Sequence, residues 1–314
     1  MVPMRNEVQV FAPATVANVA CGFDTLGFAL MRPGDDITAR FGQQPGLVIS
    51  SIKGDGGKLP LEPEKNTAGV AALRLMEHLG VVQGIELDIV KGIPAGSGLG
   101  SSACSAVAAA VAINELMGRP LSRKELLPFA LAGEAIASGG AIHADNVGPS
   151  LLGGMVLVRS NKDLDTVQLS IPEELYAAVV LPEMEILTTE ARSILRKEIS
   201  MQDAITQWGN LGGMVAGLTL SDYDLISRSL QDVIAEPYRS ALIPGFYQVK
   251  QAALNAGALG CSISGAGPAM FALCRGDETA FKVGIAMEQA FRDVGIGAER
   301  TISRVNPIGA QRIK

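Results

Sequence analysis

A glycine- and serine-rich segment, Pro94–Cys104, is the feature that most constrains how this chain can fold. It follows Ile85–Val90, whose alternating apolar and polar residues predict a half-buried strand. It leads into Ala103–Leu116, whose alanine-rich composition predicts a buried helix. A strand, a glycine-rich loop and a helix direct several backbone N–H groups, and the positive end of the helix dipole, toward one point. The segment therefore predicts a loop that binds an anion, above all a phosphate.

Two simpler interpretations of this loop remain: a flexible linker, or a tight turn whose glycines supply positive φ. A linker is not expected between a strand and a buried helix, which favours the anion site. No Walker A sequence is present, and Gly96, Gly98 and Gly100 lack the spacing of a dinucleotide-binding motif. Ser101 and Ser102 stand where the helix N-cap is expected, and their hydroxyls could also reach a phosphate or its metal ion.

Chain length, net charge and cysteine spacing limit the domain number, the partners and the compartment that we expect. A chain of 314 residues can form two domains with separate cores. The formal net charge of −6 argues against nucleic acid or an acidic membrane as a partner, so an anionic ligand has to be held locally. The four cysteines are scattered without metal-ligand spacing, the N-terminus lacks an apolar signal core, and the longest apolar run is too short to span a membrane. We expect a cytoplasmic protein with reduced thiols.

Periodic segments predict further secondary structure along the chain. The expected strands are Val8–Ala12, Asp36–Phe41, Leu47–Ile52, Leu151–Val158 and Tyr176–Leu181, and the expected helices include Asn66–Leu79, Met201–Leu218, Tyr223–Asp232 and Lys282–Val294. The first strand is expected to end at Pro13. A capping box that begins at Ser122 predicts another helix, and Pro128 is expected to bend it.

One polar run suggests where the chain divides. Arg159–Asp165 follows a predicted buried strand and separates it from the next one, which makes this run the best candidate for a domain boundary. We accordingly divide the chain into domains at residues 1–160 and 161–314.

Glu134 is the only charged residue of the segment Leu126–Ile142, which is otherwise apolar. A buried carboxylate in such a helix must be paired, protonated or bound to a metal ion, because burial without compensation is costly. The alternative is a surface glutamate on a narrow helix. The pattern alone supports both interpretations equally.

Other polar residues lie near turns. His143, Asp145 and Asn146 are expected on a glycine-flanked loop, where polar groups are more often functional than structural. Asn18 and Asp24 occur in a segment of small residues, and the local sequence favours a role in turns for both.

A phosphate loop, a serine at its helix and a solitary carboxylate together suggest a nucleotide with Mg²⁺. The ion prefers oxygen ligands and retains several waters, so one hydroxyl and one carboxylate would provide enough protein ligands. Phosphoryl transfer depends mainly on positioning and charge neutralisation, which such groups supply. The residues alone therefore predict a phosphate-handling enzyme whose acceptor is unnamed.

Pro94–Ala103 resembles the P-x-x-x-G-L-G-S-S-A motif of the small-molecule kinases of the galactokinase, homoserine kinase, mevalonate kinase and phosphomevalonate kinase superfamily. Further segments resemble motifs of its homoserine kinase branch, in order along nearly the whole chain: Thr15–Gly27, Ile142–Val147, Glu236–Arg239 and Ser262–Pro268. The resemblance implies an α+β fold of two domains. The N-terminal domain, which binds ATP, is expected to be like domain 2 of ribosomal protein S5, and the ferredoxin-like C-terminal domain completes the substrate site.

The resemblance also implies the reaction. The expected activity is ATP-dependent phosphorylation of the side-chain hydroxyl of L-homoserine to O-phospho-L-homoserine, on the route to threonine, with Mg²⁺ as cofactor. A homodimer is possible. Two alternatives remain: a mevalonate-type kinase of the same superfamily, and a nucleotide-binding regulator that has lost catalysis.

The resemblance further assigns the nucleotide site. The loop residues implied to contact ATP are Pro94, Ala95, Gly96, Ser97, Gly98, Leu99, Gly100, Ser101, Ser102, Ala103 and Cys104. Ser102 and Glu134 are the implied Mg²⁺ ligands, and Asn66 is expected to meet the adenine. Binding of Mg²⁺ would explain why a single carboxylate, that of Glu134, occurs in an otherwise apolar helix.

The implied substrate residues are Asn18, Asp24, His143, Asn146, Arg192 and Arg239. Asp24 is expected to hold the reacting hydroxyl, with Asn18 nearby. His143 and the two arginines are expected to bind the amino-acid end, where a bidentate guanidinium suits a carboxylate.

Asp145 is counted among the catalytic residues because it follows Glu134 by eleven positions, where mevalonate kinases are expected to carry a catalytic aspartate. Those kinases pair it with an N-terminal lysine, and no lysine occurs from Ala12 to Asp24. We therefore expect direct attack of the substrate hydroxyl on the γ-phosphate, with the phosphate oxygens of ATP taking the proton.

Overall fold

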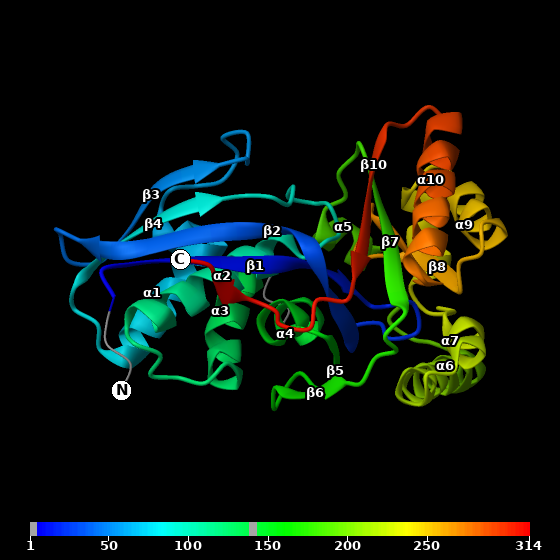
Figure 1. Cartoon of the computed structure of the whole chain (residues 1–314), viewed down its shortest axis with the longest axis horizontal. Coiled ribbons are helices and arrows are strands. Elements are labelled where there is room, and N and C mark those ends of the chain that lie inside the picture. The colour runs from blue at the N-terminus through cyan, green and yellow to red at the C-terminus, as the bar shows by residue number, and fades with distance from the viewer. Residues whose placement is uncertain (1–4, 138–142) are drawn as a thin grey trace.

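Two β-sheets, one in each half of the molecule, organise the chain (Figure 1). The computed structural model describes residues 5–137 and 143–314. Among the helices formed by these residues, none combines the length and the apolar character needed to cross a membrane.

The larger sheet has seven strands, in the order β11-β1-β2-β4-β3, with β5 paired to β2 and β6 to β5. These strands are β1 (Glu7–Ala17), β2 (Leu26–Gly42), β3 (Leu47–Lys53), β4 (Gly84–Val90), β5 (Met155–Ser160), β6 (Asp165–Leu169) and β11 (Gln311–Arg312). Four helices gather on one side of this sheet: α1 (Thr67–Leu79), α2 (Ser101–Leu116), α3 (Leu127–Ala137) and α4 (Ala144–Leu152) (Figure 1). Every residue from Ala103 to Leu116 is buried, because the small side chains of α2 let its neighbours approach closely.

The second sheet has four antiparallel strands in the order β10-β7-β9-β8. These strands are β7 (Leu175–Pro182), β8 (Gly260–Ile263), β9 (Met270–Arg275) and β10 (Ala298–Arg304). The accompanying helices are α5 (Thr188–Ser193), α6 (Met201–Leu220), α7 (Tyr223–Ser229), α8 (Glu236–Arg239), α9 (Phe246–Asn255) and α10 (Asp277–Asp293). Helices lie between the first two strands and between the last two, with α9 and α10 packed on the sheet, which is the ferredoxin-like β-α-β-β-α-β arrangement. The expected two-domain α+β fold is confirmed.

Several predicted elements differ from the observed ones at their ends. β1 does not end at Pro13 but continues to Ala17, since its register with β2 shifts between Pro13 and Thr15 and such irregularities tolerate proline. The capping-box bond from Ser122 N–H to Glu125 is present at 2.7 Å. However, a 3₁₀ turn follows it and α3 begins only at Leu127, so Pro128 lies in the first turn and does not bend the helix.

The predictions around α4 also need correction. Asp145 and Asn146 lie within α4 and not on a loop, and His143 is the N-cap residue. The two glycines before them, Gly139 and Gly140, lie outside the described residues. The predicted strand Leu151–Val158 begins only at Met155, because the end of α4 and a turn come first.

The predicted domain boundary falls inside a hairpin. Arg159–Asp165 contains the turn that joins β5 to β6, and both strands belong to the seven-stranded sheet. A division at residues 160/161 would therefore cut that sheet. The last N-terminal strand of the seven-stranded sheet, β6, ends at Leu169. The C-terminal strand β11 then adds to the same sheet by pairing with β1.

Candidate active site

The phosphate loop, Pro94–Cys104, connects β4 to α2 as the sequence predicts. The N-cap residue of α2 is Gly100, in the left-handed region, and neither Ser101 nor Ser102 caps the helix. The Ser101 hydroxyl instead donates to the carbonyl of Ile93 at 2.9 Å. Because Gly100 carries no side chain to satisfy the first N–H groups of α2, these groups remain suited to an anion.

Two glycines of the loop are required by close contacts. A Cβ on Gly98 would lie 2.6 Å from the carbonyl oxygen of Ser264, and one on Gly100 would lie 2.2 Å from the Thr15 hydroxyl. Both glycines also have positive φ, 80° and 67°. The Ser264 hydroxyl donates to the carbonyl of Gly98 at 2.8 Å, so the loop is held against the C-terminal domain as well as β1.

A cavity of about 380 Å³ lies over the loop. Its walls include Asn66 and Thr67 at the start of α1, Glu134 of α3, and the segment 185–188 that follows β7. The loop residues that line it are Ala95, Gly96, Ser97, Gly98, Gly100, Ser101 and Ser102. Pro94, Leu99, Ala103 and Cys104 are absent from this lining, because their side chains face the protein interior or the opposite side of the loop.

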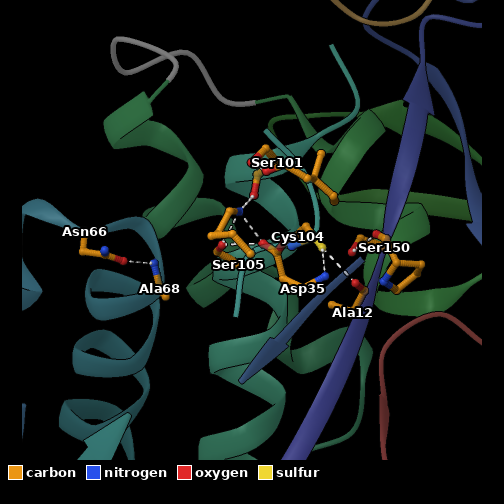
Figure 2. Close-up of polar contacts among 12 residues, drawn as sticks. Ala12, Asp35, Asn66, Ala68, Ser101, Cys104, Ser105 and Ser150 are labelled. Carbon is orange, nitrogen blue, oxygen red and sulfur yellow. Dashed lines mark hydrogen bonds and ion pairs between the residues drawn. The ribbon is translucent and has the colours of Figure 1, made fainter. Parts of the chain in front are cut away.

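The Asn66 side chain has a structural role at the edge of this cavity. Its amide oxygen accepts a hydrogen bond from the N–H of Ala68 at 3.0 Å (Figure 2) and another from the N–H of Gly69 at 3.4 Å, and so caps α1. Its amide nitrogen donates to the carbonyl of Pro60 at 2.9 Å. The expected contact between Asn66 and adenine stays a prediction.

Glu134 is half-buried, and its carboxylate is buried at the point where the larger cavity meets a smaller one. Burial raises the pKa of its carboxyl to about 7, while a hydrogen bond with Ser102 and the charge of Lys91 act in the opposite direction. The two predicted metal ligands, Glu134 and Ser102, are therefore in contact although they lie on different helices. The interpretation of Glu134 as an ordinary surface residue is wrong.

The smaller cavity, of about 60 Å³, is polar. Asp145 lines it, and so do all six residues that are expected to bind the substrate: Asn18, Asp24, His143, Asn146, Arg192 and Arg239. Glu134, Asn146 and Thr188 line both cavities, so the two adjoin. Residues predicted from four distant segments thus meet at one place.

An ion pair occupies the side of the smaller cavity that faces α5. Arg192 binds the Asp24 carboxylate through two hydrogen bonds, at 3.1 and 2.9 Å. His143 Nδ1 lies 3.5 Å from the same carboxylate. Burial lowers the pKa of His143, the charge of Asp24 raises it, and the charges of Arg192 and Arg239 lower it further.

Arg239 lies beside this pair and is 3% exposed. Its Nε donates to the carbonyl of Ala191 at 3.1 Å and its Nη1 to the carbonyl of Gly265 at 2.9 Å. The guanidinium groups of Arg239 and Arg192 lie 5.1 and 5.9 Å from the ring centroid of Phe23. Phe23 therefore supports both arginines through cation–π contacts, a role that its sequence context did not reveal.

The backbone that carries Asn18 and Asp24 is strained. Asn18, Val19, Ala20 and Asp24 all have positive φ, between 41° and 70°, which is costly for a β-branched residue such as Val19. Two bonds of the Asn18 side chain stabilise this conformation: Nδ2 donates to the carbonyl of Gly265 at 2.8 Å, and Oδ1 accepts from the N–H of Asp24 at 3.0 Å. Asn18 is thus a turn residue that also positions Asp24.

Asp145 is buried on the floor of the smaller cavity. Burial raises the pKa of its carboxyl to about 7, and the negative charges of Asp24 and Glu134 contribute in the same direction. Next to it, Asn146 accepts a hydrogen bond from the Thr15 hydroxyl at 2.7 Å. Thr15 is therefore another supporting residue of the site.

The raised pKa of Asp145 predicts how stability depends on pH. From about pH 4 to about pH 7 the folded protein retains a proton that the unfolded chain releases, so this carboxyl lowers the free energy of unfolding as pH rises. Asp145→Asn removes the effect and should be more stable than the parent protein at pH 8, by on the order of 2–4 kcal/mol, and equally stable at pH 4. Urea unfolding at both pH values measures the difference. A difference independent of pH would contradict the assignment.

The donor set suits Mg²⁺ better than a metal held in a protein cage. Within the described residues no group of three or more histidine, cysteine or acidic side chains could hold a metal ion. Ser102 and Glu134 provide a hydroxyl and a carboxylate, and Mg²⁺ is commonly bound by one or two such groups together with water and phosphate oxygens.

Comparisons with known proteins agree with this geometry. Residues 66–154 match the model described as GHMP kinases N terminal domain, and residues 214–293 match GHMP kinases C terminal. A homoserine kinase of Chloroherpeton thalassium is 50% identical over 92% of this chain and 93% of its own length. The crystal structure of a homoserine kinase from Cytophaga hutchinsonii superposes with a TM-score of 0.97 at 53% identity, covering 100% of this chain and 99% of that one.

A more distant structure extends the fold comparison. The mevalonate kinase of L. major, in complex with R-mevalonate, gives a TM-score of 0.72 at 17% identity and covers 96% of this chain and 98% of that chain. The two family models and the homoserine kinase relatives together define the class of this protein as an ATP-dependent small-molecule kinase. Within that class, the chain is about 50% identical to homoserine kinases over nearly its full length. The chain belongs to the homoserine kinases of the GHMP kinase family.

Proposed function

We propose that this protein transfers the γ-phosphoryl group of ATP to the side-chain hydroxyl of L-homoserine and so makes O-phospho-L-homoserine for threonine biosynthesis. The observation that carries the proposal is the small polar cavity with two arginines and an aspartate that adjoins the cavity over the phosphate loop. Its size suits a small zwitterion beside a nucleotide. The homoserine kinases that are about 50% identical to this chain support the same substrate.

The Asp24–Arg192 ion pair suggests how a zwitterion is recognised. An amino acid carries a carboxylate and an ammonium group about as far apart as the two partners of such a pair. The amino acid can therefore bind between the two residues and take over their mutual hydrogen bonds. Its carboxylate would bind Arg192 and Arg239, and its ammonium group would bind Asp24. This geometry favours the ammonium group as the partner of Asp24, in place of the reacting hydroxyl that the resemblance suggested. Splitting the pair costs little, since each charge gains a new partner.

The loop supports binding of the triphosphate. The loop and the N-terminal end of α2 line the larger cavity, where backbone N–H groups and the helix dipole would stabilise negative charge on the phosphates. Ser102 and Glu134 would hold Mg²⁺, which when bound neutralises charge on the phosphate oxygens. Because Glu134 lines both cavities, we expect the donor and the acceptor to meet beside it.

The transfer step follows from this placement. The substrate hydroxyl oxygen forms a bond to the γ-phosphorus while the bond from that phosphorus to the bridging oxygen of ADP breaks, and the hydroxyl proton passes to a phosphate oxygen. Asp145 is close enough to influence this chemistry through its charge, but a base is not required. Asp145→Asn should therefore keep kcat within about tenfold, whereas loss of a general base would cost about 10²–10⁴-fold.

Release of ADP in the presence of Mg²⁺, ATP and an acceptor tests the proposed function. We expect turnover with L-homoserine, and kcat/KM for mevalonate lower by about 10³-fold or more, because mevalonate lacks the ammonium group. Preference for mevalonate would support a mevalonate-type kinase. ATP binding without turnover of either acceptor would support a catalytically inactive regulator.

A homodimer and a cytoplasmic location are also proposals. The four cysteines are free and buried, in agreement with a reducing compartment. Met201, Ile205 and Trp208 form an apolar stripe on α6, and each is more than half exposed, which supports a contact with a second copy. Light scattering on the purified chain measures its mass in solution.

A further inference from the structure

A buried cluster of charged and polar groups lies directly beneath the phosphate loop (Figure 2). Its centre is an ion pair between Asp35 of β2 and Lys91, the residue after β4, whose side chains are 0% and 3% exposed. The Asp35 carboxylate also accepts hydrogen bonds from the Ser105 hydroxyl at 2.6 Å and from the N–H of Gly92 at 3.0 Å. The motif-based prediction of the site did not include any of these residues.

The hydrogen bonds of Lys91 are fully used within the protein. An ammonium group has three donors, and Lys91 directs them to Asp35, to the carbonyl of Ser101 at 2.9 Å and to the Ser105 hydroxyl at 2.8 Å. Although Lys91 lines the larger cavity, it therefore has no N–H left for a phosphate. Its contribution must come from its charge and from what it holds in place.

The cluster holds both ends of the loop. Lys91 and Gly92 stand immediately before the loop, while Ser101 and Ser105 lie in the first turns of α2, at its other end. A single carboxylate, that of Asp35, accepts hydrogen bonds from both ends: from the N–H of Gly92 and from the Ser105 hydroxyl. The separation between the two ends is thereby fixed before any ligand binds.

Cys104 anchors the same position on β1 and β2. Its thiol donates to the carbonyl of Ala12 at 2.8 Å, and its sulfur accepts from the N–H of Asp35 at 3.3 Å (Figure 2). The start of α2 is thus attached to two strands of the sheet. This attachment fixes the position of the start of α2 and thereby the orientation of the loop backbone next to it.

Stability alone does not account for such a cluster. Removing two charges from water is costly, and apolar residues of similar volume often stabilise a fold as well as a buried ion pair or better. A buried pair is better explained when it imposes a geometry that apolar packing would leave loose. Fixed donors that need no reorganisation bind an anion more tightly than donors that first have to be ordered.

We propose that the Asp35–Lys91 ion pair is a positioning device that holds both ends of the phosphate loop, so that the backbone N–H groups are directed at the nucleotide phosphates before the nucleotide binds. Asp35, Lys91 and Ser105 are positioning residues, since they act through the loop. The identity of the ligand as a nucleotide rests on the proposed function, whereas the arrangement of the loop does not.

The double variant Asp35→Asn/Lys91→Met tests the proposal. It removes both charges together, so no buried charge is left without its partner, and the amide oxygen introduced at position 35 can still accept from the N–H of Gly92. We expect a thermal unfolding midpoint close to that of the parent protein but a Kd for ADP, measured by calorimetry without acceptor, raised at least tenfold. An unchanged Kd for ADP would overturn the proposal, whether or not the unfolding midpoint falls, because the pair would then not position the loop for the nucleotide.

A matched control and a milder variant make the outcome decisive. Arg40 of β2 and Asp88 of β4 form another ion pair, away from the loop, and Arg40→Met/Asp88→Asn should leave the Kd for ADP unchanged. If the first double variant does not fold, Ser105→Ala is the alternative test. It removes one hydrogen bond from Lys91 and one from Asp35, and it should raise the Kd for ADP at least threefold. A Kd like that of the parent protein would then overturn the proposal. Turnover of L-homoserine by the parent protein tests the proposed function separately.

Discussion

Glu134→Gln is expected to lower kcat about 10³-fold while the protein stays folded. The carboxylate is buried at the junction of the two cavities, in contact with Ser102, where it would hold the metal ion that neutralises charge on the transferred phosphoryl group. Glutamine keeps the shape and one oxygen but loses the charge. Because burial disfavours the ionised carboxylate, the thermal midpoint of the variant should equal or exceed that of the parent protein.

Metal-dependent binding of ADP distinguishes this role from a general structural effect. Calorimetry should show that Mg²⁺ strengthens ADP binding to the parent protein and has little effect on binding to Glu134→Gln. Glu77→Gln is the matched control, since Glu77 is exposed on α1 and lies outside both cavities. Wild-type kcat, or an unchanged response to Mg²⁺, would remove Glu134 from the metal site.

Arg239→Met is expected to lower kcat/KM for L-homoserine by about 10²–10³-fold and to leave KM for ATP nearly unchanged. The guanidinium is almost fully buried and is fixed by the carbonyls of Ala191 and Gly265 and by the ring of Phe23. A preorganised, desolvated cation binds a carboxylate strongly, and losing such a partner typically costs about 2–5 kcal/mol. Methionine retains most of the apolar contact with Phe23, so packing changes little.

Steady-state kinetics with each substrate varied in turn measure the two effects separately. The control is Arg196→Met, because Arg196 also stacks on an aromatic ring, that of Tyr238, but lies outside the cavities. The control should keep both KM values. An equal rise of both KM values in Arg239→Met would indicate a distorted cleft, contrary to a specific role at the substrate carboxylate.

Local sequence was sufficient for the parts of the site that a short segment builds by itself. Asn66 caps α1 and Gly80 ends it in the left-handed region, as their residue types indicate. The loop joins β4 to α2 in the predicted order, and the Glu134 carboxylate is buried although the residue lies in an apolar helix. These features depend on residues within a few turns of one another, where backbone preferences and helix dipoles act.

Local sequence was insufficient where tertiary contacts decided the conformation. The glycines before His143 suggested a loop, yet packing against β1 and β2 places Asp145 and Asn146 in α4. Ser101 suggested an N-cap, but its hydroxyl bonds to Ile93 and Gly100 takes that position. In both cases a contact with another element outweighed a weak local preference.

By itself the sequence determined a phosphate-binding loop between a strand and a buried helix, because glycine conformations and the dipole of α2 are local properties. Only the tertiary structure decided which distant charges surround that loop. Asp24 and Arg192, 168 positions apart, pair through two hydrogen bonds, and Asp35 reaches Lys91 across 56 positions. Their meeting depends on strand register and on how two sheets pack, and side-chain chemistry within a short segment cannot specify either.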